Sequence, residues 1–128
     1  MYRIITNNRM CKDTYGEKLP VEYLEKGTYL EVLFAVRDYI QKGWTLETHP
    51  MTGSLKPNQT PYKSILISDR HPDREEFYMQ EITIENGILA CEKFQAVRKT
   101  PDWSERLRED FMAVDLDLIS SAVQKILS

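Results

Sequence analysis

The chain has few of the residues that most often mark a chemical site. Its 128 residues include two cysteines, Cys11 and Cys91, and two histidines, His49 and His71. The cysteines lie far apart in the sequence, no CxxC is present and no histidine cluster accompanies them. Neither a zinc site nor a redox pair is therefore indicated, and we expect no cofactor.

The sequence also lacks an excess of positive charge and any long apolar run. Lysine and arginine together number 17 against 20 aspartates and glutamates, for a net charge of -3. This balance argues against nucleic acid as a partner, because binding duplex DNA normally leaves a basic stripe. A membrane-spanning helix needs about 20 apolar residues, so no membrane segment is predicted. No signal segment precedes the strand-like "YRIIT" at Tyr2, and we expect a cytoplasmic protein.

The length and composition fit one globular unit. The 128 residues, 41% hydrophobic and 29% charged, match a single domain over residues 1–128 that buries about two-thirds of its extended surface. No internal repeat or linker interrupts the sequence. We therefore predict one core.

The first half of the chain alternates strand and helix patterns. Residues 2–6, 21–25, 44–48 and 64–68 read as strands. Residues 28–43 read as an amphipathic helix, with a threonine to cap its start and a glycine to close its end in the left-handed conformation. Because a strand, helix and strand in this order usually form a parallel crossover, we predict an α/β sandwich. Its sheet is expected to be mostly parallel, with about four strands flanked by helices.

The second half contains one ambiguous segment. Residues 78–97 fit a long helix, but Asn86-Gly87 between β-branched residues is a strong signal for a hairpin turn. The helix is favoured because "ILACEKFQAV" shows no alternation of apolar and polar residues. The hairpin stays open as the alternative.

Two amphipathic helices are predicted at the end, over residues 102–114 and 115–127. Asp102 and Glu105 have the spacing of a capping box at the start of the first. These helices are expected to cover the sheet. An exposed remnant of their apolar face would suit a homodimer.

The most polar loop, "THPMTGSLKPNQTPYKS" at residues 48–64, is the candidate site. In open α/β sheets, ligands bind beyond the carboxyl ends of strands, which here points to this loop and to the asparagines after residue 6. The mixture of amides, hydroxyls and lysines suits a small anion. No GxxxxGK[ST] phosphate loop is present. The predicted ligand-binding residues are Asn7, Asn8, His49, Gly53, Ser54, Lys56, Asn58, Thr60 and Lys63.

Two other interpretations of the loop stay open. Its prolines, glycine and hydroxyl side chains are also those of a loop that satisfies its own backbone groups, and His49 before Pro50 can simply hold a turn. Alternatively the protein is an enzyme acting on an acyl phosphate. His49 is then the weak candidate for an acid or base, while Lys56 or Lys63 stabilises charge.

Three stretches carry a family resemblance: "RIITNN", "YLEVLFAVRDYIQKGW" and, most specifically, "THPMTGSLKPNQTPYKSILIS". Over residues 2–70, and more loosely over 101–119, the chain resembles the GrdX family. These are small proteins of anaerobic bacteria encoded beside the components of glycine, sarcosine and betaine reductases. The resemblance implies the setting of Stickland amino-acid fermentation. Taken with the polar loop, it leads us to expect an accessory or regulatory protein that binds a small anionic metabolite or a reductase subunit through residues 48–64. It supplies no catalytic residue and no cofactor.

Overall fold

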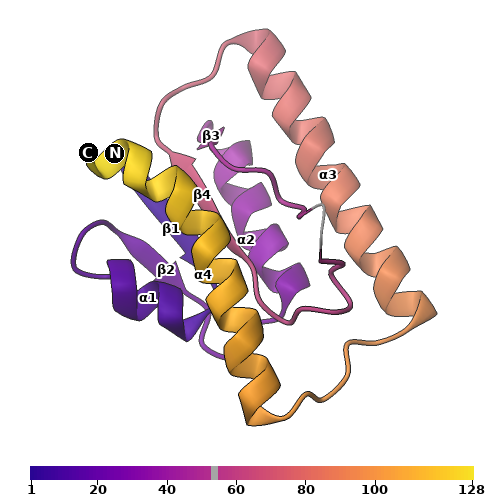
Figure 1. Cartoon of the computed structure of the whole chain (residues 1–128). Helices are drawn as coiled ribbons and strands as arrows, with labels where there is room; N and C mark the ends of the chain where they lie inside the picture. Colours follow the sequence, from indigo (N-terminus) through magenta and orange to yellow (C-terminus); the bar gives the residue numbers. More distant parts are fainter. Residues whose placement is uncertain (53–54) are drawn as a thin grey trace.

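The computed structural model describes residues 1–52 and 55–128, and within them the chain forms four strands and four helices (Figure 1). The elements follow one another as β1 (Tyr2–Thr6), α1 (Arg9–Tyr15), β2 (Val21–Tyr23), α2 (Tyr29–Gln41), β3 (Thr45–Leu46), β4 (Ser64–Ser68), α3 (Arg74–Val97) and α4 (Glu105–Leu127).

The strands form one mixed sheet in the order β2-β1-β4-β3. Strands β1 and β2 are parallel, whereas β4 runs antiparallel to both β1 and β3. The α/β class is confirmed, but the predicted mostly parallel sheet is wrong, since the pairing is mostly antiparallel. The parallel crossover is β1-α1-β2, whereas the helix α2 connects strands at opposite edges of the sheet. The last strand, β4, then enters between β1 and β3.

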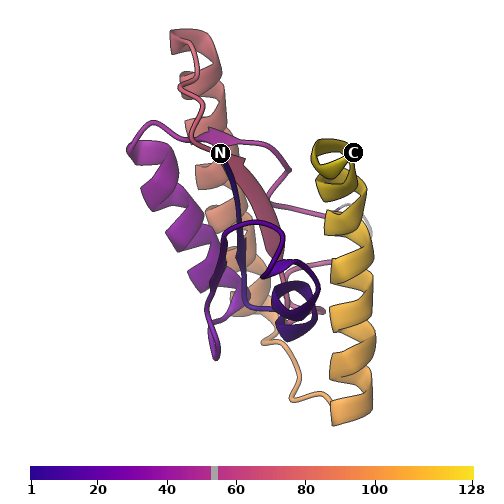
Figure 2. The ribbon, with the colours of Figure 1, turned by 90° about the vertical axis from the view of Figure 1, so that its left-hand side faces the viewer.

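Helices cover both faces of the sheet (Figure 2). Side chains alternate along β1 and β4, as in any strand. Ile5, Ile65 and Ile67 pack with α2 and α3, whereas Ile4 and Leu66 pack with α1 and α4. All five are essentially inaccessible to solvent, so two apolar layers hold the sheet between the helices.

The helix α1 was not predicted, because the asparagines after β1 were interpreted as a loop. Asn8 in fact caps this helix, and its side chain accepts a hydrogen bond from the Met10 backbone N–H. The buried Cys11 and Tyr15 lie on its inner face. A seven-residue helix with two buried residues is too short for a helical repeat of apolar residues to be recognised in the sequence.

Both predicted ends of α2 are confirmed. Thr28 and Glu31 form a capping box at its start. Gly43 follows its end with φ +94°, a conformation that side chains with a Cβ disfavour. The sequence therefore encoded this helix locally, including where it starts and stops.

Residues 78–97 lie in one helix, α3, so the favoured interpretation is confirmed over the hairpin. Asn86 and Gly87 occupy its middle. Gly87 is buried, and a Cβ placed on it would lie 3.3 Å from Pro50 Cγ. The glycine thus permits the loop after β3 to approach the helix.

The end of the chain forms one continuous helix, α4, where two were predicted. Ser104, and not Asp102, caps its start and accepts from the Leu107 N–H. No helix of the described chain is long and apolar enough to cross a membrane.

Candidate functional site

The polar residues after β1 and before β4 meet because these strand ends are paired, with Thr6 opposite Ser64. Asn7 donates to the carbonyls of Gly27 (2.9 Å) and Pro61 (2.8 Å), and its Oδ1 accepts from the Lys63 N–H at 2.9 Å. Both N–H donors and one acceptor position of the Asn7 amide are therefore used by the chain itself. This predicted ligand residue ties three segments together.

Asn8 is fully buried and makes a similar set of internal bonds. Beyond capping α1, it donates to the Met112 carbonyl and to Asp115 Oδ2, both at 2.9 Å. Asp115 also accepts from the Ser64 backbone N–H at 3.0 Å and from the Ser64 hydroxyl at 2.6 Å. Asp115 is 5% exposed and links α4 to the N-cap of α1 and to β4.

The directions of these hydrogen bonds follow from their partners. Thr6 Oγ1 accepts from the Asn8 N–H, and it lies 2.6 Å from Ser64 Oγ. Because Ser64 donates its own proton to Asp115, the Thr6 hydroxyl donates to Ser64. We call Thr6, Asn8, Ser64 and Asp115 the buried polar cluster. The hydrogen bonds of this cluster lead to the Asp115 carboxylate, and none of the four side chains has a donor left unused.

His49 and Lys63 share an inner cavity of about 180 Å³. The cavity has a polar side of Thr48, His49, Thr52, Lys63, Ser64 and Asp115 and an apolar side of Met51, Leu118 and Ile119. His49 is exposed, and its Nδ1 accepts from the Met51 N–H at 3.0 Å. One ring nitrogen therefore holds the turn. The Lys63 ammonium lies inside and donates to Thr52 Oγ1 at 3.2 Å.

Two further predicted residues have structural partners. Asn58 donates to the carbonyls of Phe94 (3.1 Å) and Arg98 (3.0 Å), and so caps the C-terminal end of α3. Thr60 is buried, and its hydroxyl accepts from the Tyr62 N–H at 3.2 Å. Gly53 and Ser54, also predicted as ligand residues, lie outside the described residues.

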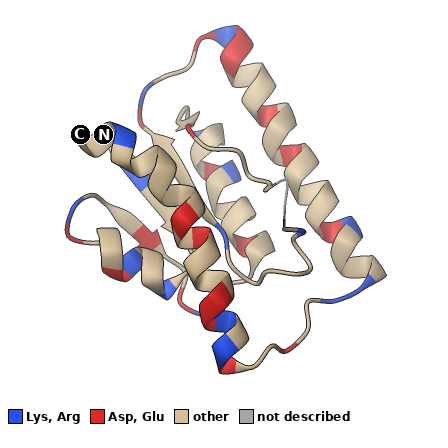
Figure 3. Ribbon diagram, viewed as in Figure 1, with Lys and Arg blue, Asp and Glu red and all other residues tan. Residues whose placement is uncertain are grey.

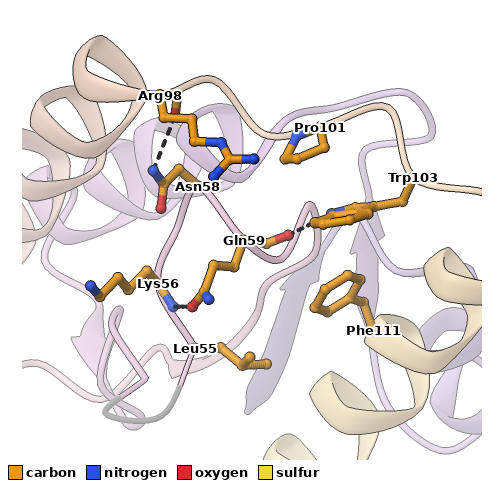
Figure 4. A pocket seen from close by; sticks show the side chains of 8 residues that line it. All are labelled: Leu55, Lys56, Asn58, Gln59, Arg98, Pro101, Trp103 and Phe111. Carbon is orange, nitrogen blue, oxygen red and sulfur yellow. Dashed lines mark hydrogen bonds between the residues drawn. The ribbon is translucent and has the colours of Figure 1, made fainter.

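A larger hollow, the outer cleft, opens where the loop meets the chain between α3 and α4 (Figure 4). Its volume is about 500 Å³. It is lined by Leu55, Lys56, Asn58, Gln59, Arg98, Pro101, Trp103 and Phe111. Lys56 and Asn58 were predicted, whereas Arg98, Trp103 and Phe111 were missed. The sequence signal for them is weak: a basic pair, a proline and a tryptophan between two helices.

The cleft combines an arginine with an aromatic wall. Trp103 and Phe111 have ring centroids 5.6 Å apart, and Trp103 Nε1 donates to the Gln59 carbonyl at 2.8 Å. The Arg98 side chain extends over the cleft between Asn58 and Pro101 (Figure 4). The Lys56 ammonium turns away from the aromatic pair and lies 5.6 Å from the centroid of the Phe94 ring. Arg98 is therefore the cation that faces the cleft, and Lys56 stands at its rim.

These two cations are uncompensated. Among the residues that the structure describes, neither the Arg98 guanidinium nor the Lys56 ammonium forms an ion pair with an acidic group, in contrast to Arg37, Arg70 and Arg108. Figure 3 shows basic residues both in the loop and just after α3, the two segments that contribute Lys56 and Arg98 to the lining of the cleft. The outer cleft is thus locally basic in a chain whose net charge is negative.

The cysteines and acidic residues offer little for metal or redox chemistry. Burial raises the pKa of both thiols, Cys11 and Cys91, to about 11, so both are protonated at neutral pH. Within residues 1–52 and 55–128, no group of three or more histidine, cysteine or acidic side chains is arranged to hold a metal ion.

Comparison with known proteins places the chain in a family. The family model described as GrdX-like protein matches residues 3–124, which is nearly the whole sequence. No curated protein and no solved structure matches the chain. The match extends the resemblance seen in the first half through α3 and most of α4. The chain belongs to the GrdX-like protein family.

Proposed function

We propose that this GrdX-like protein is an accessory or regulatory protein that binds a small anionic metabolite in the outer cleft. The observation that carries the proposal is the Arg98 guanidinium, which faces the cleft and has no acidic partner among the described residues. The family name suggests the setting, the glycine or betaine reductase system. The ligand would then be a metabolite of that system.

The chemistry of the cleft suits an anion with an apolar or planar part. A guanidinium presents donors in a fixed fork that matches a carboxylate or phosphate with two parallel hydrogen bonds. The Trp103 and Phe111 rings supply an apolar wall on the other side. The volume of about 500 Å³ falls within the range common for small-molecule sites. A reductase subunit would need to insert an acidic side chain here to use the same groups.

The separation of the predicted residues favours binding over catalysis. An enzyme acting on an acyl phosphate would need His49, a lysine amine and an asparagine around one ligand. His49 shares the inner cavity with Lys63, but among the described residues no asparagine lines that cavity, whereas Lys56 and Asn58 line the outer cleft. The His49 Nδ1 and the Asn58 amide are also engaged in holding the backbone. We therefore do not assign either residue a role in a reaction.

Isothermal titration and thermal unfolding with acetyl phosphate, phosphate, glycine and betaine test the proposal. We expect an anion to bind and the two zwitterions to bind more weakly, because the charged residues among the described lining of the cleft, Lys56 and Arg98, are both cations. A ligand at a hundred times its Kd adds about 2.7 kcal/mol to the free energy of unfolding. Absence of binding by every compound would count against a metabolite site.

Variants locate the binding. Arg98→Gln should weaken the anion roughly tenfold or more, because a hydrogen bond to a charged group is lost. Arg74→Gln is the matched control, since Arg74 is an exposed arginine in the first turn of α3, the helix that ends just before Arg98. Equal affinities for the two variants would contradict a site at the outer cleft.

A further inference from the structure

The inner cavity shares no lining residue with the outer cleft. It lies between the loop after β3, the start of β4 and the inward face of α4. We propose that the inner cavity is a second binding site, which takes a small monocarboxylate of about the size of acetate on the Lys63 ammonium. This proposal does not depend on the outer cleft.

Lys63 is the first part of the argument. It is only 7% exposed, and within the described chain its Nζ has one hydrogen-bond partner, Thr52 Oγ1. An ammonium group carries three donors, so two of them have no partner within the described chain, and Lys63 lines the cavity. A buried charge without a counter-ion is costly. In agreement, burial lowers the pKa of Lys63, and the Asp115 carboxylate opposes only part of that shift.

Asp115 is not the missing counter-ion. It forms no ion pair with Lys63, and its oxygens accept from Asn8 and from the backbone and hydroxyl of Ser64. These donors, from the N-cap of α1 and from β4, stabilise the negative charge of the carboxylate. The cavity is therefore lined by the Lys63 cation and by the Asp115 carboxylate, whose oxygens already accept hydrogen bonds from other donors.

Other groups on the polar side are also donors. Thr48 Oγ1 accepts from the Leu66 N–H at 2.9 Å, which leaves the proton of the Thr48 hydroxyl to be donated. The Thr52 hydroxyl accepts from Lys63 Nζ and lines the same cavity. In the neutral His49 ring, the bond from Met51 to Nδ1 places the proton on Nε2. A ligand that only accepts hydrogen bonds is complementary to this set.

Size and charge restrict the ligand further. A volume of about 180 Å³ suits a ligand of a few heavy atoms. Met51, Leu118 and Ile119 form an apolar side suited to a methyl group. The nearby Asp115 disfavours a second negative charge, so a monocarboxylate fits better than a phosphate dianion.

The experiment measures acetate binding by titration at constant ionic strength, with chloride as the reference salt. Wild-type protein should bind acetate. Lys63→Met, which replaces the ammonium with an apolar group of similar length, should weaken acetate roughly ten- to a hundredfold. Lys93→Met is the matched control, because Lys93 is an exposed lysine of α3 that lines neither the inner cavity nor the outer cleft. Each titration is repeated in an Arg98→Gln background, which removes the arginine of the outer cleft and so separates this result from the test of the outer cleft.

Thr52→Val provides a second variant that conserves side-chain shape and keeps the lysine. It should weaken acetate less than Lys63→Met does, since only one hydroxyl is lost, and it covers the case in which Lys63→Met does not fold. The proposal is overturned if wild-type protein does not bind acetate, if acetate binding is lost in Arg98→Gln, or if Lys63→Met and Thr52→Val bind acetate as tightly as Lys93→Met does.

Discussion

The buried polar cluster and the outer cleft are both rich in polar side chains, but they differ in how these groups are satisfied. In the cluster, Asp115 accepts three hydrogen bonds, and no buried side-chain nitrogen or oxygen of the described chain lacks a partner. In the cleft, Arg98 extends over the hollow without an acidic partner among the described residues. The cluster has no free capacity and holds the fold together, whereas the cleft has capacity for a ligand. On this basis we distinguish the structural polar groups, whose donors and acceptors are satisfied, from the polar groups that we propose to bind a ligand.

Removing the carboxylate of the buried polar cluster should have the largest effect on stability. Asp115→Ala leaves three buried donors without an acceptor, and each unsatisfied group costs about 1 to 3 kcal/mol. We expect the free energy of unfolding in urea to fall by about 3 kcal/mol or more. Asp117→Ala, which changes an exposed acid two residues along α4, should stay within about 0.5 kcal/mol of wild type. Equal stability of the two variants would show that Asp115 does not anchor α4.

The loop residue Asn58 should have an intermediate effect. Asn58→Ala removes the two hydrogen bonds that cap the end of α3, and we expect a loss of about 1 to 2 kcal/mol in urea unfolding. Asn86→Ala is the control, because Asn86 is exposed in the middle of the same helix, where alanine is the better helix former. An unchanged stability of Asn58→Ala would return this residue to the set of free ligand candidates.

The pH dependence of stability should reveal Lys63. Burial lowers its pKa in the folded protein below the ordinary value of 10.5, so the unfolded chain binds more protons between these two pKa values. Stability therefore rises with pH across this range as far as Lys63 is concerned. The two buried cysteines act oppositely, because their pKa values are raised from 9.0 to about 11. Urea unfolding of wild type and Lys63→Met at several pH values isolates the lysine, and the wild type should gain relative to the variant as pH rises. A constant difference between the two proteins would contradict a buried charged lysine.

The sequence predicts the elements of this fold better than their pairing. Thr28 and Gly43 mark the ends of α2 through local chemistry, and both assignments are correct. Whether two strands pair in parallel or antiparallel depends on which strands are neighbours in the sheet. The short helix α1, which completes the parallel crossover, was not predicted because Asn8 was interpreted as a loop residue. Sequence patterns that span only a few residues therefore did not predict the order of the strands in the sheet.

The candidate site divides in the same way. The polar residues of the loop do not form one site: some hold the backbone through hydrogen bonds, some line the inner cavity and some line the outer cleft. Asp115 was missed because the last helix was divided at residue 114, which placed this acid in a solvated first turn. Read as one helix, Asp115 falls on the buried stripe with Met112, Ile119 and Val123. An acid at an apolar position of a long helix was the available signal.

The cations of the outer cleft should contribute least to stability, and this prediction distinguishes a ligand site from a structural one most directly. Arg98 and Lys56 are exposed, and within the described chain neither pairs with an acid, so their removal breaks no ion pair there. Arg98→Gln and Lys56→Gln should each change the free energy of unfolding by about 0.5 kcal/mol or less. A small gain is also reasonable for the double variant, because two uncompensated like charges are removed. If instead either substitution destabilised the ligand-free protein as much as Asn58→Ala does, the cleft would be another part of the scaffold. A loss of anion affinity in Arg98→Gln without loss of stability is the combination that only a binding site produces.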